Sequence, residues 1–362
     1  MRHLVVVAAG TGGHIMPGLA VAAEMARRGW SVSWLGTRSG MENRLVPAAG
    51  IALDTVGFAG LRGKGFVQWV KGAFELLGAC GRSLAILRRR GADAVLAMGG
   101  YVCVPAGLMA AVLGRPLLLV NADAALLLST RLLLPFAGRV AFGFDGPAAG
   151  ALRRAIVTGN PVRREIEAIA EPPTRFAGRS GPLRLLVVGG SLGARAINDA
   201  LPAALALVPP AARPQVTHQA GHAHAEALRA AYAAAGVDAL VLPFIDDMAA
   251  RLADCDLMLC RSGAITVSEL CAAGVAAILV PLVVGTTAHQ RDNAEYMARH
   301  GAAIHLPQAE LAPDRLAALL QRLDRATLAG LAARARALRK PDAAARVADE
   351  IERLVASREV AA

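Results

Sequence analysis

The stretch HLVVVAAGTGGHIMPGLAVAAEMARRG, residues 3–29, decides the fold of the first half of the chain. An uncharged apolar run, residues 3–9, leads through a glycine turn into a segment that we expect to be helical from Pro17, because proline suits the first helical turn. Gly29 is expected to end this helix. The order of strand, glycine turn and helix is typical of α/β domains with a buried parallel sheet.

The stretch LRLLVVGGSLGARAINDAL, residues 183–201, repeats this order halfway along the chain. Apolar runs and helical segments alternate in both halves. The expected strands are 3–9, 31–35, 51–56, 94–98, 116–120, 139–142, 183–188, 215–218, 240–243, 257–260 and 276–280, and the expected helices include 41–49, 104–113 and 124–135. The sequence therefore predicts two Rossmann-like, doubly wound α/β domains that face a central cleft. Residues 172–182, rich in proline, glycine and charge, are the best candidate for a linker.

The composition indicates a globular protein with an anionic partner. Of 362 residues, 55% are hydrophobic, and 39 lysines and arginines against 28 aspartates and glutamates leave a net charge of +11. Charge alone leaves nucleic acid, acidic lipid and phosphorylated substrates open. The five cysteines show no CxxC pairing and the first residues lack a secretory signal, so we expect a cytoplasmic location. Residues 94–114 and 270–288 are uncharged, but their glycines and prolines favour buried strands and short helices over membrane spans.

Two glycine loops favour the binding of phosphate. Residues 10–14, GTGGH, and residues 189–193, GGSLG, each join a strand to a helix, where free backbone amides attract an anion. The first loop departs from the dinucleotide pattern GxGxxG because Ile15 replaces the third glycine, so a nicotinamide cofactor is disfavoured. His14 can accept a proton near neutral pH. The alternatives are a turn that simply needs glycine and a histidine with a structural hydrogen bond.

Other polar residues are typical of nucleotide and sugar recognition. Arg163, in TGNPVR, can bind phosphate through two hydrogen bonds, although the Asn-Pro turn is also typical of a hinge. Glu269 ends another strand-to-helix segment, residues 261–269, and can accept hydrogen bonds from ribose hydroxyls or form a reciprocal helix cap with Thr266. Gln290 and Asn293, near the start of a later helix, carry amides that recognise sugar hydroxyls.

Three further patterns have structural explanations. His218, His222 and His224 have a spacing compatible with zinc, but no thiolate or suitable acid accompanies them. Asp254 and Asp256 resemble a cation-binding pair, and we interpret them as residues that bound a strand. Residues 58–82 mix aromatic, aliphatic and basic side chains, which is typical both of a membrane-surface segment and of a core helix with one solvated face.

Seven segments, in order and spanning nearly the whole chain, resemble the MurG family of N-acetylglucosaminyltransferases. They are AGTGGHIMPGLAVA (9–22), AMGGYVCVPAG (97–107), TGNPVR (158–163), GGSLGA (189–194), FIDDM (244–248), CRSGAITVSE (260–269) and HQRDNA (289–294). This family converts lipid I into lipid II in peptidoglycan synthesis. The resemblance implies a GT-B fold in which residues 1–160 bind the acceptor and the membrane, residues 161–341 bind UDP-N-acetylglucosamine, and a helix at 342–362 packs back on the first domain.

The resemblance also implies the residues of the site. The acceptor and its diphosphate are expected at Thr11, Gly12, Gly13, His14, Gly99, Gly100 and Tyr101. The donor is expected at Arg163, Ser191, the backbone of Ile245, Ala264, Ile265, Thr266, Val267, Ser268, Glu269, Gln290 and Asn293. The family usually has His-Glu-Gln-Asn where this chain has Val120, Asn121, Ala122 and Asp123. Asp123 is therefore expected to bind a sugar hydroxyl or to act as base in place of His14.

The implied reaction is a single displacement, in which the 4-hydroxyl of the muramyl sugar attacks the anomeric carbon and inverts it. It requires no metal or cofactor. The implied partners are UDP-N-acetylglucosamine, lipid I (undecaprenyl-pyrophosphoryl-MurNAc-pentapeptide) and anionic lipids, with no nucleic acid, at the cytoplasmic face of the bacterial inner membrane. Two alternatives stay open: another nucleotide-sugar enzyme, such as an epimerase or a transferase for a different lipid, and a non-enzymatic membrane- or nucleic-acid-binding protein.

Overall fold

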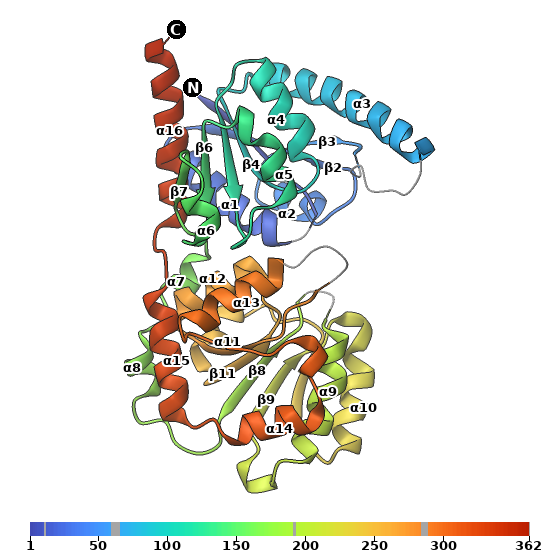
Figure 1. The fold of residues 1–362 in the computed structure, drawn as a ribbon, viewed down its shortest axis with the longest axis vertical. Coiled ribbons are helices and arrows are strands. Elements are labelled where there is room, and N and C mark those ends of the chain that lie inside the picture. The colour runs from blue at the N-terminus through green and yellow to red at the C-terminus, as the bar shows by residue number, and fades with distance from the viewer. Residues whose placement is uncertain (11, 59–65, 191–192, 284–288, 362) are drawn as a thin grey trace. The chain divides into compact units, whose positions relative to one another are not determined.

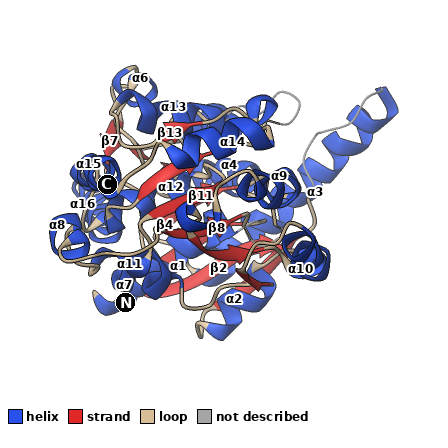
Figure 2. Cartoon of the chain, turned by 90° about the horizontal axis from the view of Figure 1, so that it is seen from below, coloured by secondary structure: helices blue, strands red, loops and turns tan. Residues whose placement is uncertain are grey.

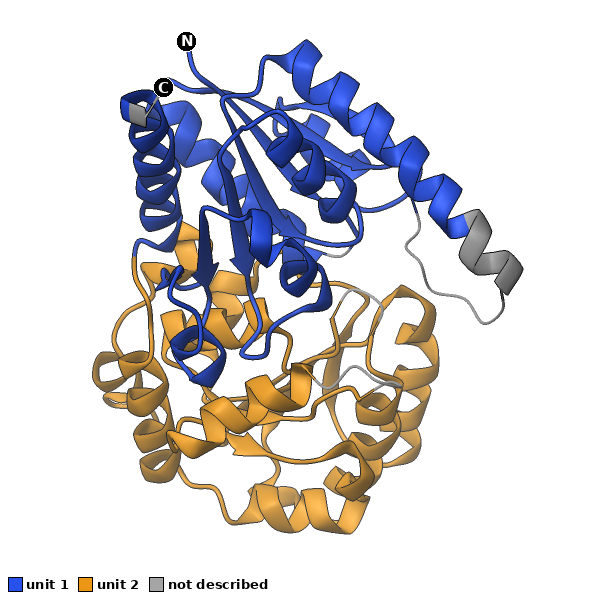
Figure 3. Cartoon of the chain, turned by 45° about the horizontal axis from the view of Figure 1, so that its top comes forward, with its two compact units in different colours: residues 1–162, 342–362 blue, residues 163–341 orange. Residues whose placement is uncertain are grey.

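The chain forms two compact units in the computed structural model (Figure 3). The structure describes residues 1–10, 12–58, 66–190, 193–283 and 289–361, without the side chains of residues 66–71. Unit 1 comprises Met1–Val162 and Asp342–Ala362, and unit 2 comprises Arg163–Pro341. The chain therefore leaves unit 1 after Val162 and returns to it after Pro341.

Unit 1 is built on a seven-stranded parallel sheet with the order β3-β2-β1-β4-β5-β6-β7 (Figure 1). Its strands are β1 His3–Ala8, β2 Ser31–Thr37, β3 Ala52–Val56, β4 Ala94–Gly99, β5 Leu117–Asn121, β6 Arg139–Phe142 and β7 Ala155–Val157. Its helices are α1 Gly12–Arg27, α2 Glu42–Ala48, α3 Phe66–Arg90, α4 Cys103–Val112, α5 Leu128–Leu133, the 3₁₀ turn η1 Leu134–Phe136, α6 Pro147–Gly150 and α16 Ala343–Ala361. The strand order reverses direction between β1 and β4.

Unit 2 has a six-stranded parallel sheet with the order β10-β9-β8-β11-β12-β13. Its strands are β8 Arg184–Val188, β9 Gln215–Gln219, β10 Ala239–Leu242, β11 Leu257–Cys260, β12 Ala276–Leu279 and β13 Ile304–His305. Its principal helices are α7 Arg164–Glu167, α8 Pro172–Phe176, α9 Arg195–Ala206, α10 Ala225–Ala234, α11 Met248–Asp254, α12 Ala264–Ala273, α13 His289–Arg299, α14 Pro313–Gln321 and α15 Arg325–Ala337. Here the strand order reverses between β8 and β11.

Figure 2 shows the strands in red, surrounded by the helices in blue. Alternating side chains of the strands fill cores on both faces of the first sheet. Val5 and Val7 of β1 pack toward α3 and α4, whereas Leu4 and Val6 pack toward α1 and α16. Burial on both faces explains why the strands read as continuous apolar runs. No helix in the described part of the chain combines the length and the hydropathy that crossing a bilayer requires.

The first helix begins earlier than the sequence predicted. α1 starts at Gly12, so Pro17 lies inside it instead of in its first turn. An interior proline removes one backbone hydrogen bond. The glycines of the loop therefore form the helix start themselves, and the first amides of α1 belong to Gly12, Gly13 and His14.

Two other predictions about elements are wrong. The helix expected at 124–135 shrinks to α5 and η1, because the Asn121 side chain bonds to the carbonyls of Asp123 and Ala125 and to the amide of Leu127, which holds these residues in a turn. The expected linker at 172–182 begins with α8, which packs against α15. Buried Arg175 of α8 donates hydrogen bonds to the carbonyls of Ala273 and Gly274 and fixes the segment to unit 2.

Candidate functional site

In unit 1, the loops after β1 and β4 meet at the point where the strand order reverses. A Cβ at Gly99 would lie 2.5 Å from Nδ1 of His14, so the imidazole packs directly on this glycine. Gly100 has a φ of +92°, and a Cβ there would lie 2.9 Å from the carbonyl oxygen of Ala9. Both positions therefore require glycine. The structure brings His14, Gly99 and Gly100 together, with Tyr101 exposed beside them.

The loop after β5, next to β4 in the sheet, carries Asp123. Asn160 Nδ2 donates a hydrogen bond of 2.8 Å to the carbonyl of Ala122, and Asn121 Nδ2 donates one of 2.8 Å to the carbonyl of Asp123. These two buried amides hold the backbone on both sides of Asp123, and Asp123 itself is almost entirely buried. Asp123 thus stands at the carboxyl edge of the sheet, as His14 does. Thr11 lies outside the described residues.

In unit 2, the loop after β8 is fixed by contacts that exclude larger residues. A Cβ at Gly193, whose φ is +77°, would lie 2.0 Å from the carbonyl oxygen of Ala220. At Gly189 it would lie 2.3 Å from the amide nitrogen of Ala194. Gln219 Nε2, at the end of β9, donates a 2.8 Å hydrogen bond to the carbonyl of Gly190. Ser191 lies outside the described residues.

The loop after β11 leads directly into α12. Gly263 is the N-cap of this helix and provides no side-chain cap, so the first free amides are those of Ala264, Ile265 and Thr266. Thr266 lies in the first helical turn, and the reciprocal cap between Thr266 and Glu269 is therefore wrong. Val267 is fully buried, and Ser268 Oγ donates a 2.9 Å hydrogen bond to the carbonyl of Ala264.

Arg163 and Glu269 lie side by side, although 106 residues separate them. Nε and Nη2 of Arg163 donate hydrogen bonds of 3.0 and 2.8 Å to Oε1 of Glu269. Burial raises the pKa of the Glu269 carboxyl, and the positive charge of Arg163 opposes that rise. The pair places a cation and a carboxylate on the same side of α12.

The start of α13 is tied to the loops after β11 and β12. Ser262 Oγ donates to the carbonyl of Gln290, and Asn293 Nδ2 donates a 3.0 Å hydrogen bond to the carbonyl of Ser262. Oε1 of Gln290 accepts a 3.0 Å hydrogen bond from the amide of Leu282. Asn293 is fully buried and orders the loop after β11, whereas Gln290 is partly exposed. Ile245, in the loop after β10, has a buried side chain.

The patterns outside these loops have structural roles. His218 is buried, with its ring nitrogens 2.9 Å from the Tyr232 hydroxyl and 3.1 Å from Asn198 Oδ1, and burial lowers its pKa to about 3. Asp254 pairs with Arg184, while Asp256 pairs with Arg179 and Arg325. The described residues contain no group of three side chains able to hold a metal ion.

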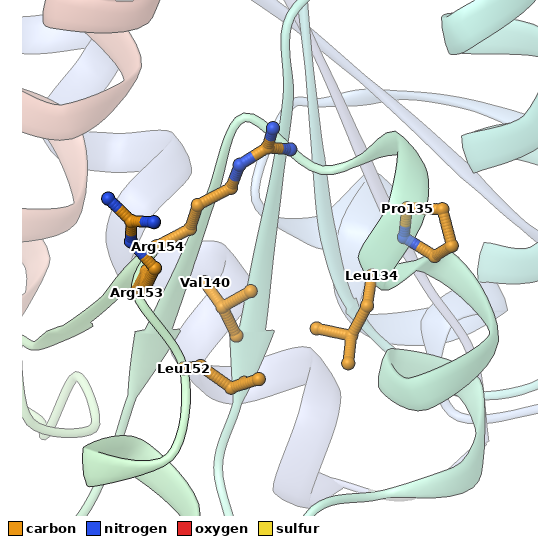
Figure 4. Close-up of a pocket in the computed structure, with 6 residues that line it drawn as sticks. All are labelled: Leu134, Pro135, Val140, Leu152, Arg153 and Arg154. Atoms are coloured by element: carbon orange, nitrogen blue, oxygen red, sulfur yellow. The ribbon is translucent and has the colours of Figure 1, made fainter.

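A cavity of about 400 Å³ in unit 1 lies away from the loops described above (Figure 4). Its lining residues are Leu134, Pro135, Val140, Leu152, Arg153 and Arg154. Val140 is near the amino end of β6, whereas ligands of doubly wound sheets bind beyond the carboxyl ends of the strands. This cavity is therefore separate from the candidate site.

The chain is similar to known proteins over almost its full length. The Glycosyltransferase family 28 N-terminal domain matches residues 4–142, and the C-terminal domain of the same family matches residues 184–351. The UDP-N-acetylglucosamine–N-acetylmuramyl-(pentapeptide) pyrophosphoryl-undecaprenol N-acetylglucosamine transferase of Methylibium petroleiphilum is 67% identical over 98% of both chains. The enzyme of the same name from Chromobacterium violaceum is 61% identical, also over 98% of both chains.

Solved structures agree with these matches. MurG from Acinetobacter baumannii is 36% identical and superposes with a TM-score of 0.84, covering 98% of this chain and 100% of the other. A calicheamicin glycosyltransferase, 19% identical with a TM-score of 0.67 over 99% of both chains, shares the fold. The two parallel-sheet domains and their loops thus define a family 28 glycosyltransferase with the GT-B fold, which confirms the predicted fold class. The chain belongs to the MurG family of N-acetylglucosamine transferases.

Proposed function

We propose that this enzyme transfers N-acetylglucosamine from UDP-N-acetylglucosamine to the 4-hydroxyl of the muramyl sugar of lipid I, which gives lipid II for peptidoglycan synthesis. One observation carries the assignment to this site. In each unit, the glycine loop after the first strand and the loop after the strand across the reversal point lie at the same edge of the sheet. Such reversal points are where doubly wound sheets bind phosphorylated ligands.

Unit 1 receives the lipid acceptor in this proposal. The amides of Gly12 and Gly13, at the start of α1, bind the diphosphate of the acceptor, and Gly99, Gly100 and Tyr101 form the adjacent wall. Thr11 is assigned to the acceptor as well, from its place in the sequence motif. The contact between the His14 ring and Gly99 supports this arrangement, because it holds the imidazole at the carboxyl edge of β1 and β4.

Unit 2 receives the nucleotide sugar. Arg163, Ser191 and the first amides of α12, from Ala264 to Thr266, bind the diphosphate, with Val267 and Ser268 anchoring the helix in the core. Glu269 accepts hydrogen bonds from the ribose hydroxyls, and the backbone of Ile245 meets uracil. Gln290 binds the sugar hydroxyls, and Asn293 holds the loop beside it. The ion pair between Arg163 and Glu269 supports this assignment, since it brings the expected phosphate and ribose ligands together.

The chemistry needs one base and a stabilised leaving group. His14, or Asp123 if it holds that role, accepts the proton of the attacking hydroxyl, a contribution of about 10² to 10⁴ in rate. The hydroxyl oxygen bonds to the anomeric carbon as the bond to the UDP oxygen breaks, and the anomeric centre inverts. Arg163 and the α12 amides stabilise the charge that develops on the departing diphosphate.

A transfer assay tests this function. The purified enzyme should move radiolabel from UDP-N-acetylglucosamine into a butanol-extractable lipid only when lipid I is present. His14→Ala and Asp123→Asn should be compared, and the variant of the true base should lose about 100-fold or more in kcat while its donor affinity stays within about twofold. Epimerised UDP-sugar without transfer, or transfer to another lipid in preference to lipid I, would overturn the proposal.

The enzyme works at the cytoplasmic face of the inner membrane in this proposal. Large apolar side chains are exposed on four neighbouring elements of unit 1: Phe74 and Leu77 on α3, Val112 at the end of α4, Leu128 and Leu132 on α5, and Phe136 in η1. The exposed cations Arg82 and Arg131 accompany them. Apolar and basic side chains together favour an anionic lipid surface. This surface of α3, α4, α5 and η1 is called the apolar face below.

A further inference from the structure

Glu42 is a buried carboxylate beside the first glycine loop, and no sequence pattern pointed to it. It is the first residue of α2 and its side chain is fully buried. Its Oε2 accepts a 3.2 Å hydrogen bond from the backbone amide of Gly10. Its Oε1 accepts bonds of 3.0 and 2.6 Å from the amide and the hydroxyl of Thr37, at the end of β2. One side chain thus joins the loops after β1 and β2.

The surrounding backbone is shaped to admit this carboxylate. A Cβ at Gly40 would lie 2.2 Å from Oε2 of Glu42, and one at Gly36 would lie 2.8 Å from its Cγ. Within the described part of the chain, the carboxylate accepts its hydrogen bonds from neutral donors, and none of them is a cation. A buried charge without a counterion is costly unless it is fully hydrogen-bonded. The three donors therefore stabilise the buried carboxylate in place of a counterion.

Gly10 is held from both sides by this part of the chain. Glu42 binds its amide, and the amide of the preceding residue, Met41, donates a 3.4 Å hydrogen bond to its carbonyl. Gly10 has a φ of +102°, a conformation that few other residues adopt. α1 begins only two residues later. The conformation of Gly10 therefore sets the direction in which Gly12, Gly13 and His14 leave the sheet.

We propose that Glu42 is a positioning residue, which acts on the acceptor through Gly10 and sets the glycine loop and His14 for the reaction. The carboxylate also occupies the Gly10 amide, so the acceptor diphosphate must use the amides farther along, at the start of α1. This inference rests on the proposed function for its activity measurement. It predicts that the acceptor side of the reaction depends on Glu42, whereas the donor side, in unit 2, does not.

Glu42→Gln tests the proposal with little change in volume. The glutamine amide replaces one acceptor oxygen by a donor, which must then face the amide of Gly10 or Thr37. We expect kcat to fall about tenfold or more, since small misplacements of reacting groups have effects of this size or greater. The Kd for UDP-N-acetylglucosamine should stay within about twofold. Hydrogen exchange of residues 8–16 should accelerate about tenfold.

Glu24→Gln is the matched control. Glu24 is also a buried carboxylate of unit 1, only 5% exposed, but its partners include the side chains of Arg27, the last residue of its own helix α1, and of Arg28, the next residue. The kcat of the Glu24→Gln enzyme and the hydrogen exchange of its residues 8–16 should match those of the wild type, even if the Tm of the variant is lower. Thr37→Val, which removes only the hydroxyl donor, provides a milder variant if Glu42→Gln fails to fold, and should lower kcat by a smaller factor.

Three results would overturn the positioning role. These are a Glu42→Gln enzyme with kcat within twofold of the wild type, unchanged exchange of residues 8–16, or equal losses in Glu42→Gln and Glu24→Gln. If Glu42→Gln does not fold, a Thr37→Val enzyme with wild-type kcat and exchange overturns it. A wild-type enzyme that fails to transfer sugar to lipid I would instead contradict the proposed function, and the exchange experiment would still decide the role of Glu42.

Discussion

Two opposing influences act on the pKa of the Glu269 carboxyl, which belongs to the proposed donor site. Burial raises its pKa, and the adjacent Arg163 guanidinium limits the rise. In the proposed site the ionised form accepts hydrogen bonds from the ribose hydroxyls, so donor affinity should fall as the pH drops through this pKa. Removing the charge of Arg163 removes the opposing influence. In Arg163→Met, the acid limb of the pH profile, where the affinity for UDP-N-acetylglucosamine falls as the pH drops, should therefore move to higher pH.

Calorimetric Kd values across a pH series would measure this shift, which is separate from the overall loss of affinity that accompanies the lost phosphate ligand. Arg195→Met is the control, because Arg195 forms an exposed ion pair with Asp199 on α9. Its acid limb should coincide with that of the wild type. An acid limb of Arg163→Met that stays in place, or moves to lower pH, would contradict the interaction described for Glu269.

At the same scale, residue type and spacing predicted much of the candidate site but not its contacts. The glycine loops and Arg163 are visible in the sequence because backbone conformation and charge are local properties. The Arg163–Glu269 pair spans 106 residues, so only the fold reveals it. Asn293 has the amide expected of a sugar ligand, yet it is buried against the Ser262 carbonyl. Glu42 gave no signal because its partners, two backbone amides and the Thr37 hydroxyl, belong to other segments of the chain.

At the scale of elements, apolar periodicity located most strands within one or two residues, since burial on both faces fixes their composition. The predicted ends of elements were wrong where a side chain competes for backbone hydrogen bonds, as the side chain of Asn121 does before α5. The short edge strands β7 and β13 were missed, because three and two residues are too few to show a period.

The closing helix α16 illustrates how strongly an element can be fixed. Val347, Ile351 and Val355 recur every four residues and are buried in the core that α1 shares. Arg28, the residue after α1, adds 2.7 Å ion pairs to Asp349 and Glu352. Ile351→Ala should lower the free energy of unfolding by about 2 to 4 kcal/mol through lost burial and a residual cavity. Val360→Ala, at a side chain 91% exposed on the same helix, should change it by less than about 0.5 kcal/mol.

Denaturant unfolding of both variants measures the difference. Equal stabilities of Ile351→Ala and Val360→Ala would mean that α16 does not depend on its apolar stripe for attachment to unit 1. A loss confined to Ile351→Ala would show that the residues after Pro341 contribute to the stability of the first unit, although they follow the second unit in the sequence.

At the scale of the whole molecule, a net charge of +11 and the apolar face should contribute to the proposed membrane binding in different ways. Charge attraction reaches about 10 Å at 0.1 M salt and about 3 Å at 1 M, so it weakens as salt rises. Apolar burial has no such dependence on screening. Binding to vesicles that contain phosphatidylglycerol should therefore fall with salt to a remainder that the apolar face supplies, and binding to neutral vesicles should be weak throughout.

The double variant Phe74→Asp with Leu77→Asp tests whether the apolar face supplies the vesicle binding that persists at high salt. These side chains are 71% and 68% exposed, so their replacement should leave the fold intact while lowering vesicle binding at every salt concentration, about tenfold or more. Leu207→Asp, at a side chain 57% exposed in unit 2, adds one of the same charges away from the apolar face and should bind as the wild type does. Co-sedimentation measures all three proteins. If the double variant and Leu207→Asp bind equally, net charge alone accounts for the attraction and the apolar face does not contact lipid.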